Sequence, residues 1–140
     1  MSKHCFSYGS LMFPDVMHAV AAQKGMRSVP AKLKGWQRFR IRDHTYPAAC
    51  RSTAAASILG ILWFDLSDSA WKRLDEFEGE VYRRVNVEVE SESGIHSAWV
   101  YEYLRPELLL AEDWDELAFQ RQHAASFFSQ HGAHLLSLKD

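Results

Sequence analysis

Residues 85–104, VNVEVESESGIHSAWVYEYL, contain the pattern that decides the fold. Valines alternate with polar residues over 85–90, which is typical of a strand with one buried face. A Glu-Ser-Gly turn follows at 92–94, and residues 95–104 form a second run of strand length. Two such runs joined by a few turn residues predict an antiparallel hairpin.

The segments before this hairpin predict further strands and two helices. Pro14 suits the first turn of a helix because that position needs no amide donor. Residues 58–66 are nearly all apolar and predict the most central strand. The other expected elements are a strand at 4–8, a helix from Pro14 to a stop at Gly25, a half-buried strand at 33–42 with Arg38, Arg40 and Arg42 on its solvated face, and a loop at 43–57.

A second helix is expected between Ser67, which suits an N-cap, and Gly79, which suits a stop. A closing helix is expected from about Trp114 to Gln130. Strands interleaved with few helices favour an α+β fold, a mixed sheet or small barrel with flanking helices, over a doubly wound fold. We expect one domain over residues 1–140.

Composition excludes several classes of protein. With 140 residues, of which 47% are hydrophobic, the chain can close one core. A net charge of −2 argues against nucleic-acid binding, and no apolar run approaches the ~20 residues of a membrane span. Cys5 and Cys50 match no metal or redox spacing, and the histidines match no ligand motif. The first residues lack a secretory pattern, so a cytoplasmic protein without metal is expected.

Glu78 is the candidate catalytic residue. At helical spacing it falls in the apolar sector formed by Trp71, Leu74 and Phe77, whereas Glu76 falls on the opposite side. Burial and the negative end of the helix dipole both favour a raised carboxyl pKa, which suits a proton shuttle near neutral pH. The alternative is a frayed last turn that lets Glu78 reach water.

The candidate binding loop lies near the start of the chain. A strand that turns through Gly9 into a helix presents free amide groups, which suit a carboxylate or an oxyanion. Tyr8 and Ser10 can add hydroxyl groups. The alternative is a purely structural connection, and the glycine patterns of nucleotide-binding loops are absent.

Several short motifs occur together in one order: Tyr8-Gly9-Ser10-Leu11, Tyr46-Pro47-Ala48, Gly60, Leu74-Asp75-x-Phe77-Glu78-Gly79 and Tyr82-x-Arg84. In this order they resemble the γ-glutamylcyclotransferase-like superfamily, and most closely its bacterial and plant avirulence-induced-gene-like branch. The resemblance implies a small β-barrel with flanking helices. It also implies a cofactor-independent enzyme that cyclises a γ-glutamyl compound to 5-oxoproline and releases an amine or amino acid.

The resemblance also implies residue roles. Tyr8, Gly9, Ser10 and Leu11 would bind the glutamyl end of the substrate, and Glu78 would transfer protons. Tyr82 would lie near the pocket, although it is out of phase with the valine face of its strand.

Two other functions stay open. The substrate could be a γ-glutamylamine or a γ-glutamyl-blocked metabolite, or the chain could be a non-catalytic module that binds a small carboxylate. Glu78 in an apolar sector favours the enzyme, because an ionised glutamate would repel a carboxylate ligand. The sequence names neither the amine half of the substrate nor the oligomeric state, and it leaves the roles of Tyr82, Tyr101 and Tyr103 open.

Overall fold

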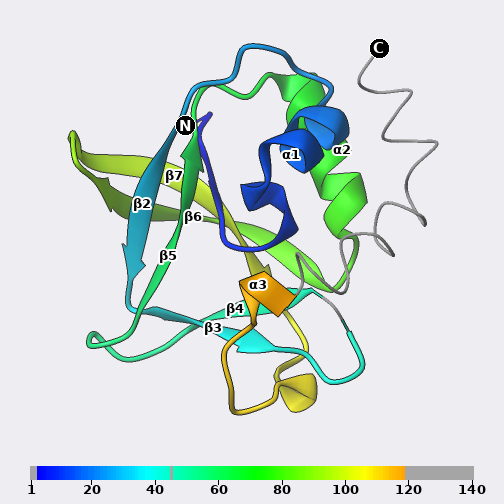
Figure 1. Ribbon diagram of the computed structural model, residues 1–140, viewed down its shortest axis with the longest axis vertical. Coiled ribbons are helices and arrows are strands. Elements are labelled where there is room, and N and C mark those ends of the chain that lie inside the picture. The colour runs from blue at the N-terminus through cyan, green and yellow to red at the C-terminus, as the bar shows by residue number, and fades with distance from the viewer. Residues whose placement is uncertain (1–2, 45, 119–140) are drawn as a thin grey trace.

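The computed structural model describes residues 3–44 and 46–118 of the chain. Within them five strands close a barrel, in which all neighbouring pairs are antiparallel except β1 and β7, which are parallel and close the ring (Figure 1). Around the barrel the order is β1 (Cys5–Ser7), β5 (Ser57–Trp63), β2 (Ser28–Lys34), β6 (Tyr82–Ser91) and β7 (Gly94–Tyr103). The expected α+β barrel with flanking helices is confirmed.

A second, two-stranded sheet corrects two of the sequence predictions. The strand predicted at 33–42 is divided at Gly35, whose φ of 80° is a left-handed conformation that favours glycine, between β2 and β3 (Trp36–Arg40). The loop prediction for 43–57 was wrong, because β4 (Pro47–Arg51) lies there and pairs antiparallel with β3. The short side chains of β4 gave a weak strand signal, yet they allow the strand to be buried.

Two helices cover one side of the barrel (Figure 1). Helix α1 (Pro14–Ala21) ends earlier than expected, because Ala22 adopts the left-handed conformation, with φ 54°, ahead of Gly25. Helix α2 (Asp68–Glu78) has the expected ends: Ser67 Oγ accepts a hydrogen bond from the Ala70 amide at 3.1 Å, and Gly79 follows with φ 80°. None of the helices in the described part of the chain has the length and apolar content that a membrane span requires.

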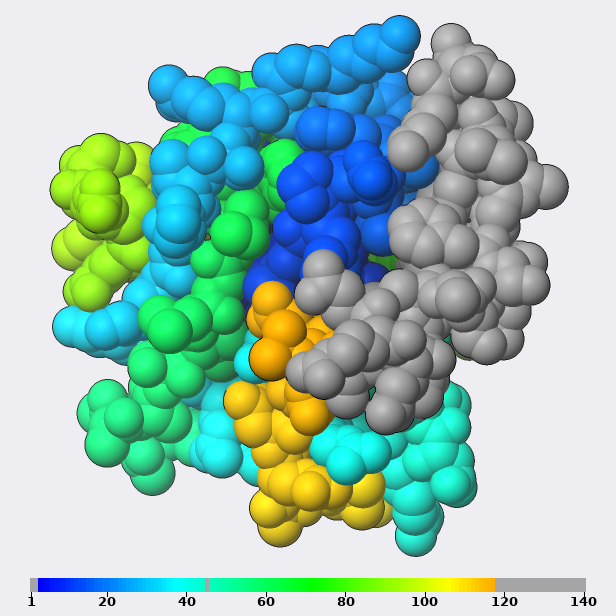
Figure 2. Space-filling model, in the orientation of Figure 1, coloured from blue at the N-terminus to red at the C-terminus, as the bar shows by residue number. Residues whose placement is uncertain are grey.

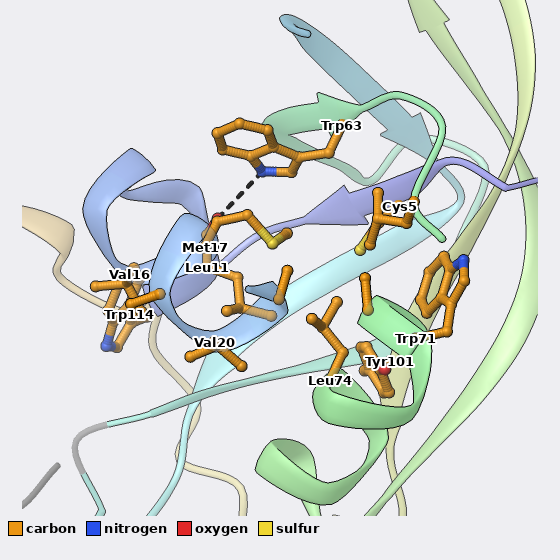
Figure 3. Packing of buried hydrophobic residues seen from close by; sticks show 14 residues of the cluster. Cys5, Leu11, Val16, Met17, Val20, Trp63, Trp71, Leu74, Tyr101 and Trp114 are labelled. Atoms are coloured by element: carbon orange, nitrogen blue, oxygen red, sulfur yellow. Dashed lines mark hydrogen bonds between the residues drawn. The ribbon is translucent and has the colours of Figure 1, made fainter. Parts of the chain in front are cut away.

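The hairpin of β6 and β7 packs on one face along the barrel interior, and on its other face only at the end near Tyr82 and Tyr101. Its ladder runs unbroken from the pair Tyr82 and Tyr103 to the pair Ser91 and Gly94, which confirms the predicted hairpin. One face, with Val89 and Val100, fills the barrel interior. The other face contributes side chains such as Tyr101 to a second core under α1 and α2, which Figure 3 shows from close by.

The chain after β7 runs along β3. It passes through η2 (Pro106–Leu108), and its backbone then exchanges two hydrogen bonds with Arg40, whose amide donates to Glu112 O and whose carbonyl accepts from Leu110 N, each at 2.9 Å. Figure 2 shows this segment, in yellow and orange, on the surface beside the cyan β3–β4 region. Trp114 is buried just before α3 (Glu116–Ala118), and the rest of the closing helix predicted to Gln130 lies outside the described residues.

Candidate active site

All six site residues expected from the sequence line one cavity. The empty space there is about 350 Å³, part of it open to solvent. The cavity lies between the end of β1, the start of β4, the end of α2 and the outer face of the β6–β7 hairpin. Its lining residues are Phe6, Ser7, Tyr8, Gly9, Ser10, Leu11, Tyr46, Pro47, Glu78, Tyr82 and Tyr101.

The loop after β1 is held from both ends. Arg38 donates a hydrogen bond from Nη1 to the Tyr8 carbonyl at 2.9 Å, and Trp63 donates one from Nε1 to the Leu11 carbonyl at 3.1 Å (Figure 3). Gly9 packs against Pro47, because a β-carbon built on Gly9 would lie 2.7 Å from Pro47 Cγ. The backbone between Tyr8 and Leu11 is therefore fixed before any ligand binds.

This fixed loop leaves backbone amides available. It continues into the short helix η1 (Ser10–Met12), where Gly9 O accepts from Met12 N at 2.9 Å and Ser10 O accepts from Phe13 N at 3.1 Å. Among the backbone hydrogen bonds of the described residues, the amides of Gly9 to Leu11 donate to none, and no side chain caps η1. N–H groups arranged in this way can bind a carboxylate or a developing oxyanion.

Gly60, which belongs to the motif pattern of the sequence, supports the loop from the neighbouring strand. It lies in β5 beside the end of β1, and a β-carbon there would overlap the carbonyl oxygen of Ser7 and the ring of Phe6. Glycine at this position therefore allows β1 to approach β5 closely at the point where the chain enters the loop.

Glu78 is the last residue of α2 and is half-buried at the cavity. Burial raises the pKa of its carboxyl group from 4.5 to about 8, and the negative charge of Asp75, one turn earlier, adds to the effect. Glu76 is exposed, as its helical phase predicted. With a pKa near 8 Glu78 can both accept and return a proton close to neutral pH.

Three tyrosines carry neutral hydroxyl groups around the cavity. Tyr82 donates to the Pro47 carbonyl at 2.8 Å, Tyr8 donates to the Tyr101 carbonyl, and Tyr101 donates to Asp75 Oδ1 at 2.7 Å. Burial raises the pKa of each of these phenols above its usual value, so each hydroxyl keeps its proton. Tyr82 reaches the cavity without a bulge, because the cavity lies on the side of the hairpin opposite the valines.

Asp75 links the tyrosines to a charged cluster behind the cavity. Its carboxylate pairs with Arg84, with 3.0 Å between Arg84 Nε and Asp75 Oδ1. The Arg84 guanidinium also lies over the rings of Trp71 and Trp99, 4.5 and 5.2 Å from their centroids. This cluster fixes the hydroxyl of Tyr101 and the last turn of α2 relative to each other.

The sequence did not predict a role in this site for several of its residues. Tyr46 and Pro47 stood in the motif pattern without an assigned role, and both line the cavity. Arg38 was placed on a solvated face, but its side chain is only 15% exposed and binds both the Tyr8 carbonyl and Asp113. No local signal identifies Arg38, because its partners are distant in sequence.

Two further kinds of chemical group would bear on the chemistry of this cavity: a reactive thiol and a metal-binding cluster. Burial raises the pKa of the Cys5 thiol to about 12, so that thiol is a weak nucleophile at neutral pH. Within residues 3–44 and 46–118, no group of three or more His, Cys, Asp or Glu side chains is arranged to hold a metal ion.

The chain belongs to the family described as gamma-glutamyl cyclotransferase, AIG2-like, whose model matches residues 5–116. The protein AIG2 C from Arabidopsis thaliana is 29% identical over 129 residues, which cover 90% of this chain and 77% of that protein. AIG2-like protein C from the same plant is 36% identical over 84 residues, covering 60% and 48%.

Solved structures show the same fold. An Arabidopsis thaliana protein determined in solution superposes with a TM-score of 0.70 at 28% identity, covering 100% of this chain and 86% of that chain. A protein named gamma-glutamyl cyclotransferase superposes with a TM-score of 0.62 at 15% identity, covering 95% and 88%. At that identity the second likeness concerns the fold alone.

Proposed function

We propose that this chain is an enzyme that cyclises a γ-glutamyl compound to 5-oxoproline and releases the attached amine or amino acid. The family and the fold support a γ-glutamylcyclotransferase-like function. The observation that carries the finer proposal is the pairing, in one cavity, of Glu78 with the available amides of residues 9–11.

The loop would bind and polarise the glutamyl half of the substrate. The amides of Gly9, Ser10 and Leu11 are candidates to stabilise the oxyanion that develops on the γ-carbonyl oxygen. The hydroxyl groups of Tyr82 and Tyr101 already donate their protons to the Pro47 carbonyl and to Asp75, so they line the cavity as neutral groups and leave the oxyanion to the backbone amides. Holding the flexible glutamyl chain in a bent, near-attack shape can contribute several kcal/mol, which is about 10³-fold or more in rate.

The chemical step needs one residue that accepts and then returns a proton. The α-amine nitrogen of the substrate attacks its own γ-carbonyl carbon and forms the ring C–N bond. Ionised Glu78 takes the proton that this nitrogen loses. The protonated carboxyl then gives a proton to the leaving nitrogen while the original γ-amide C–N bond breaks. Atoms and electrons balance within the substrate and Glu78 alone.

The proposal is tested by incubating the purified chain with γ-glutamyl amino acids, γ-glutamyl-ε-lysine and simple γ-glutamylamines, without added metal or nucleotide. Mass spectrometry should detect 5-oxoproline from at least one of them, at a rate that a chelator leaves unchanged. If a γ-glutamyl compound binds in calorimetry while the whole panel stays unreacted, the chain is a binding module. If nothing binds, the substrate class is wrong.

A further inference from the structure

A second cavity adjoins the first and shares three of its lining residues. Tyr46, Glu78 and Tyr82 line both cavities. The second cavity is the larger of the two, with about 810 Å³ of empty space, part of it open to solvent, against about 350 Å³ in the first. A substrate whose scissile bond lies at Glu78 can therefore extend from the first cavity into the second.

The walls of this second cavity are mainly apolar. Its other lining side chains include Phe77 from α2, Val81 from the turn after it, Ile41 after β3, and Leu108 from η2. Val81 is 37% exposed, so an apolar group that fills the cavity removes apolar surface from water. A ligand with an aliphatic or aromatic body fits this surface better than a purely polar ligand.

The polar groups at this cavity, apart from Glu78 and the tyrosines, are His44 and Arg105. Among the described residues the Arg105 guanidinium makes no ion pair or hydrogen bond, although Glu107 follows two positions later. At the Tyr103 phenol in the cavity wall, the charge of Arg105 opposes the rise in pKa that burial causes, and the weaker effect of Glu107 adds to that rise. An unpaired guanidinium favours a carboxylate and repels an ammonium group.

The backbone that carries Arg105 is fixed against β3. Leu108 N donates to Arg105 O at 3.0 Å, and Arg42 N donates to Leu108 O at 2.9 Å. The guanidinium is thus attached to a chain segment that is tied to the sheet, even though the side chain itself is exposed. A fixed backbone reduces the cost of ordering this side chain around a ligand.

Resting on the proposed function, we propose that the second cavity binds the leaving half of the substrate, and that this half is an α-amino acid with an apolar side chain. The apolar side chain packs on Phe77, Val81 and Leu108, and the α-carboxylate pairs with Arg105. Simple amines lack the carboxylate, and polyamines place a cation beside the guanidinium, so both are poorer substrates.

The test compares γ-glutamyl-leucine with γ-glutamyl-3-methylbutylamine, which is the same compound without the carboxylate. The wild-type chain should prefer γ-glutamyl-leucine about three- to fivefold in kcat/KM, as expected for one ion pair at an exposed site. Arg105→Gln should remove this preference by slowing γ-glutamyl-leucine alone. The matched control is Arg83→Gln, whose arginine is exposed, pairs with Glu102 and lines neither cavity; it should keep the preference.

A third substrate tests the apolar part of the proposal. γ-Glutamyl-glycine has the carboxylate without the side chain, and its kcat/KM should be at least about tenfold below that of γ-glutamyl-leucine. Three results would each overturn the inference: equal kcat/KM for the leucine and amine compounds, a preference that survives Arg105→Gln, or equal kcat/KM for the glycine and leucine compounds. In each case the release of 5-oxoproline would still support the proposed function. If no compound releases 5-oxoproline, both fail together.

Discussion

Gly9 and Pro47 are in contact with no room for a side chain between them. A β-carbon on Gly9 would lie 2.7 Å from Pro47 Cγ and 3.0 Å from Pro47 Cδ. The contact joins two cavity walls that are far apart in sequence, the loop after β1 and the start of β4. Because Tyr82 also donates to the Pro47 carbonyl, the position of this proline affects the hydroxyl of Tyr82 as well.

Gly9→Ala should therefore displace the loop and weaken substrate binding. Overpacking of this kind costs about 1–3 kcal/mol, and we expect a loss of about tenfold or more in affinity for a non-cyclisable γ-glutamyl analogue in calorimetry. The double variant Gly9→Ala/Pro47→Ala removes Cγ and Cδ of the proline and should recover most of the affinity. Unchanged affinity in Gly9→Ala would refute the role of the loop.

The pKa of Glu78 can be measured directly by a carbon-13 NMR titration of the side-chain carboxyl groups, with Glu78→Gln used to assign the signal. We expect a value of about 8, raised first by burial and then by Asp75. Asp75→Asn should lower the value but leave it above 4.5, because burial remains. A Glu78 signal that titrates near 4.5 would contradict the buried, proton-transferring carboxyl.

The same pKa predicts how stability depends on pH. The folded chain keeps the Glu78 proton up to about pH 8, whereas the unfolded chain releases it near 4.5. The stability tied to this group is complete below pH 4.5 and is lost as the pH rises through 8. The difference between 8 and 4.5, at about 1.4 kcal/mol per pH unit, is at most about 5 kcal/mol.

Glu78→Gln removes this ionisation, so the variant should gain stability relative to wild type as the pH rises. Denaturant unfolding at pH 5 and pH 9 measures the effect. The free energy of unfolding of the variant minus that of wild type should increase between these pH values by a few kcal/mol. A difference that stays constant with pH would show that Glu78 ionises freely in the folded chain.

Elements with local signals were predictable from the sequence. The β6–β7 hairpin followed from alternating valines around a turn, and α2 followed from its Ser67 cap, its apolar stripe and Gly79. Strand β4 was missed because Ala48 and Ala49 have no strong strand preference. Only the pairing with β3 and the burial beneath neighbouring chain segments define that strand, and neither is a local property.

The residues of the candidate site that have a local sequence signal were also predictable, and the others were not. Glu78 and the loop after β1 have local signatures, a helical phase and a glycine turn, and the structure brings them to one cavity. The contribution of Arg38 could not be predicted, because strand phase placed it in solvent while its partners, Tyr8 and Asp113, come from other parts of the chain. The position of Tyr82 required knowing that the outer face of the hairpin is also covered at the end where Tyr82 and Tyr101 lie.

The most direct test of the central claim is the rate of 5-oxoproline release by Glu78→Gln, measured beside Glu76→Gln as a matched control on the exposed face of the same helix. Glutamine keeps the shape of glutamate but cannot accept a proton. We predict that Glu78→Gln lowers kcat by at least about 10²-fold while the fold is retained, and that Glu76→Gln keeps the wild-type rate. A Glu78→Gln variant with wild-type activity, or inactivation by Glu76→Gln instead, would contradict the account.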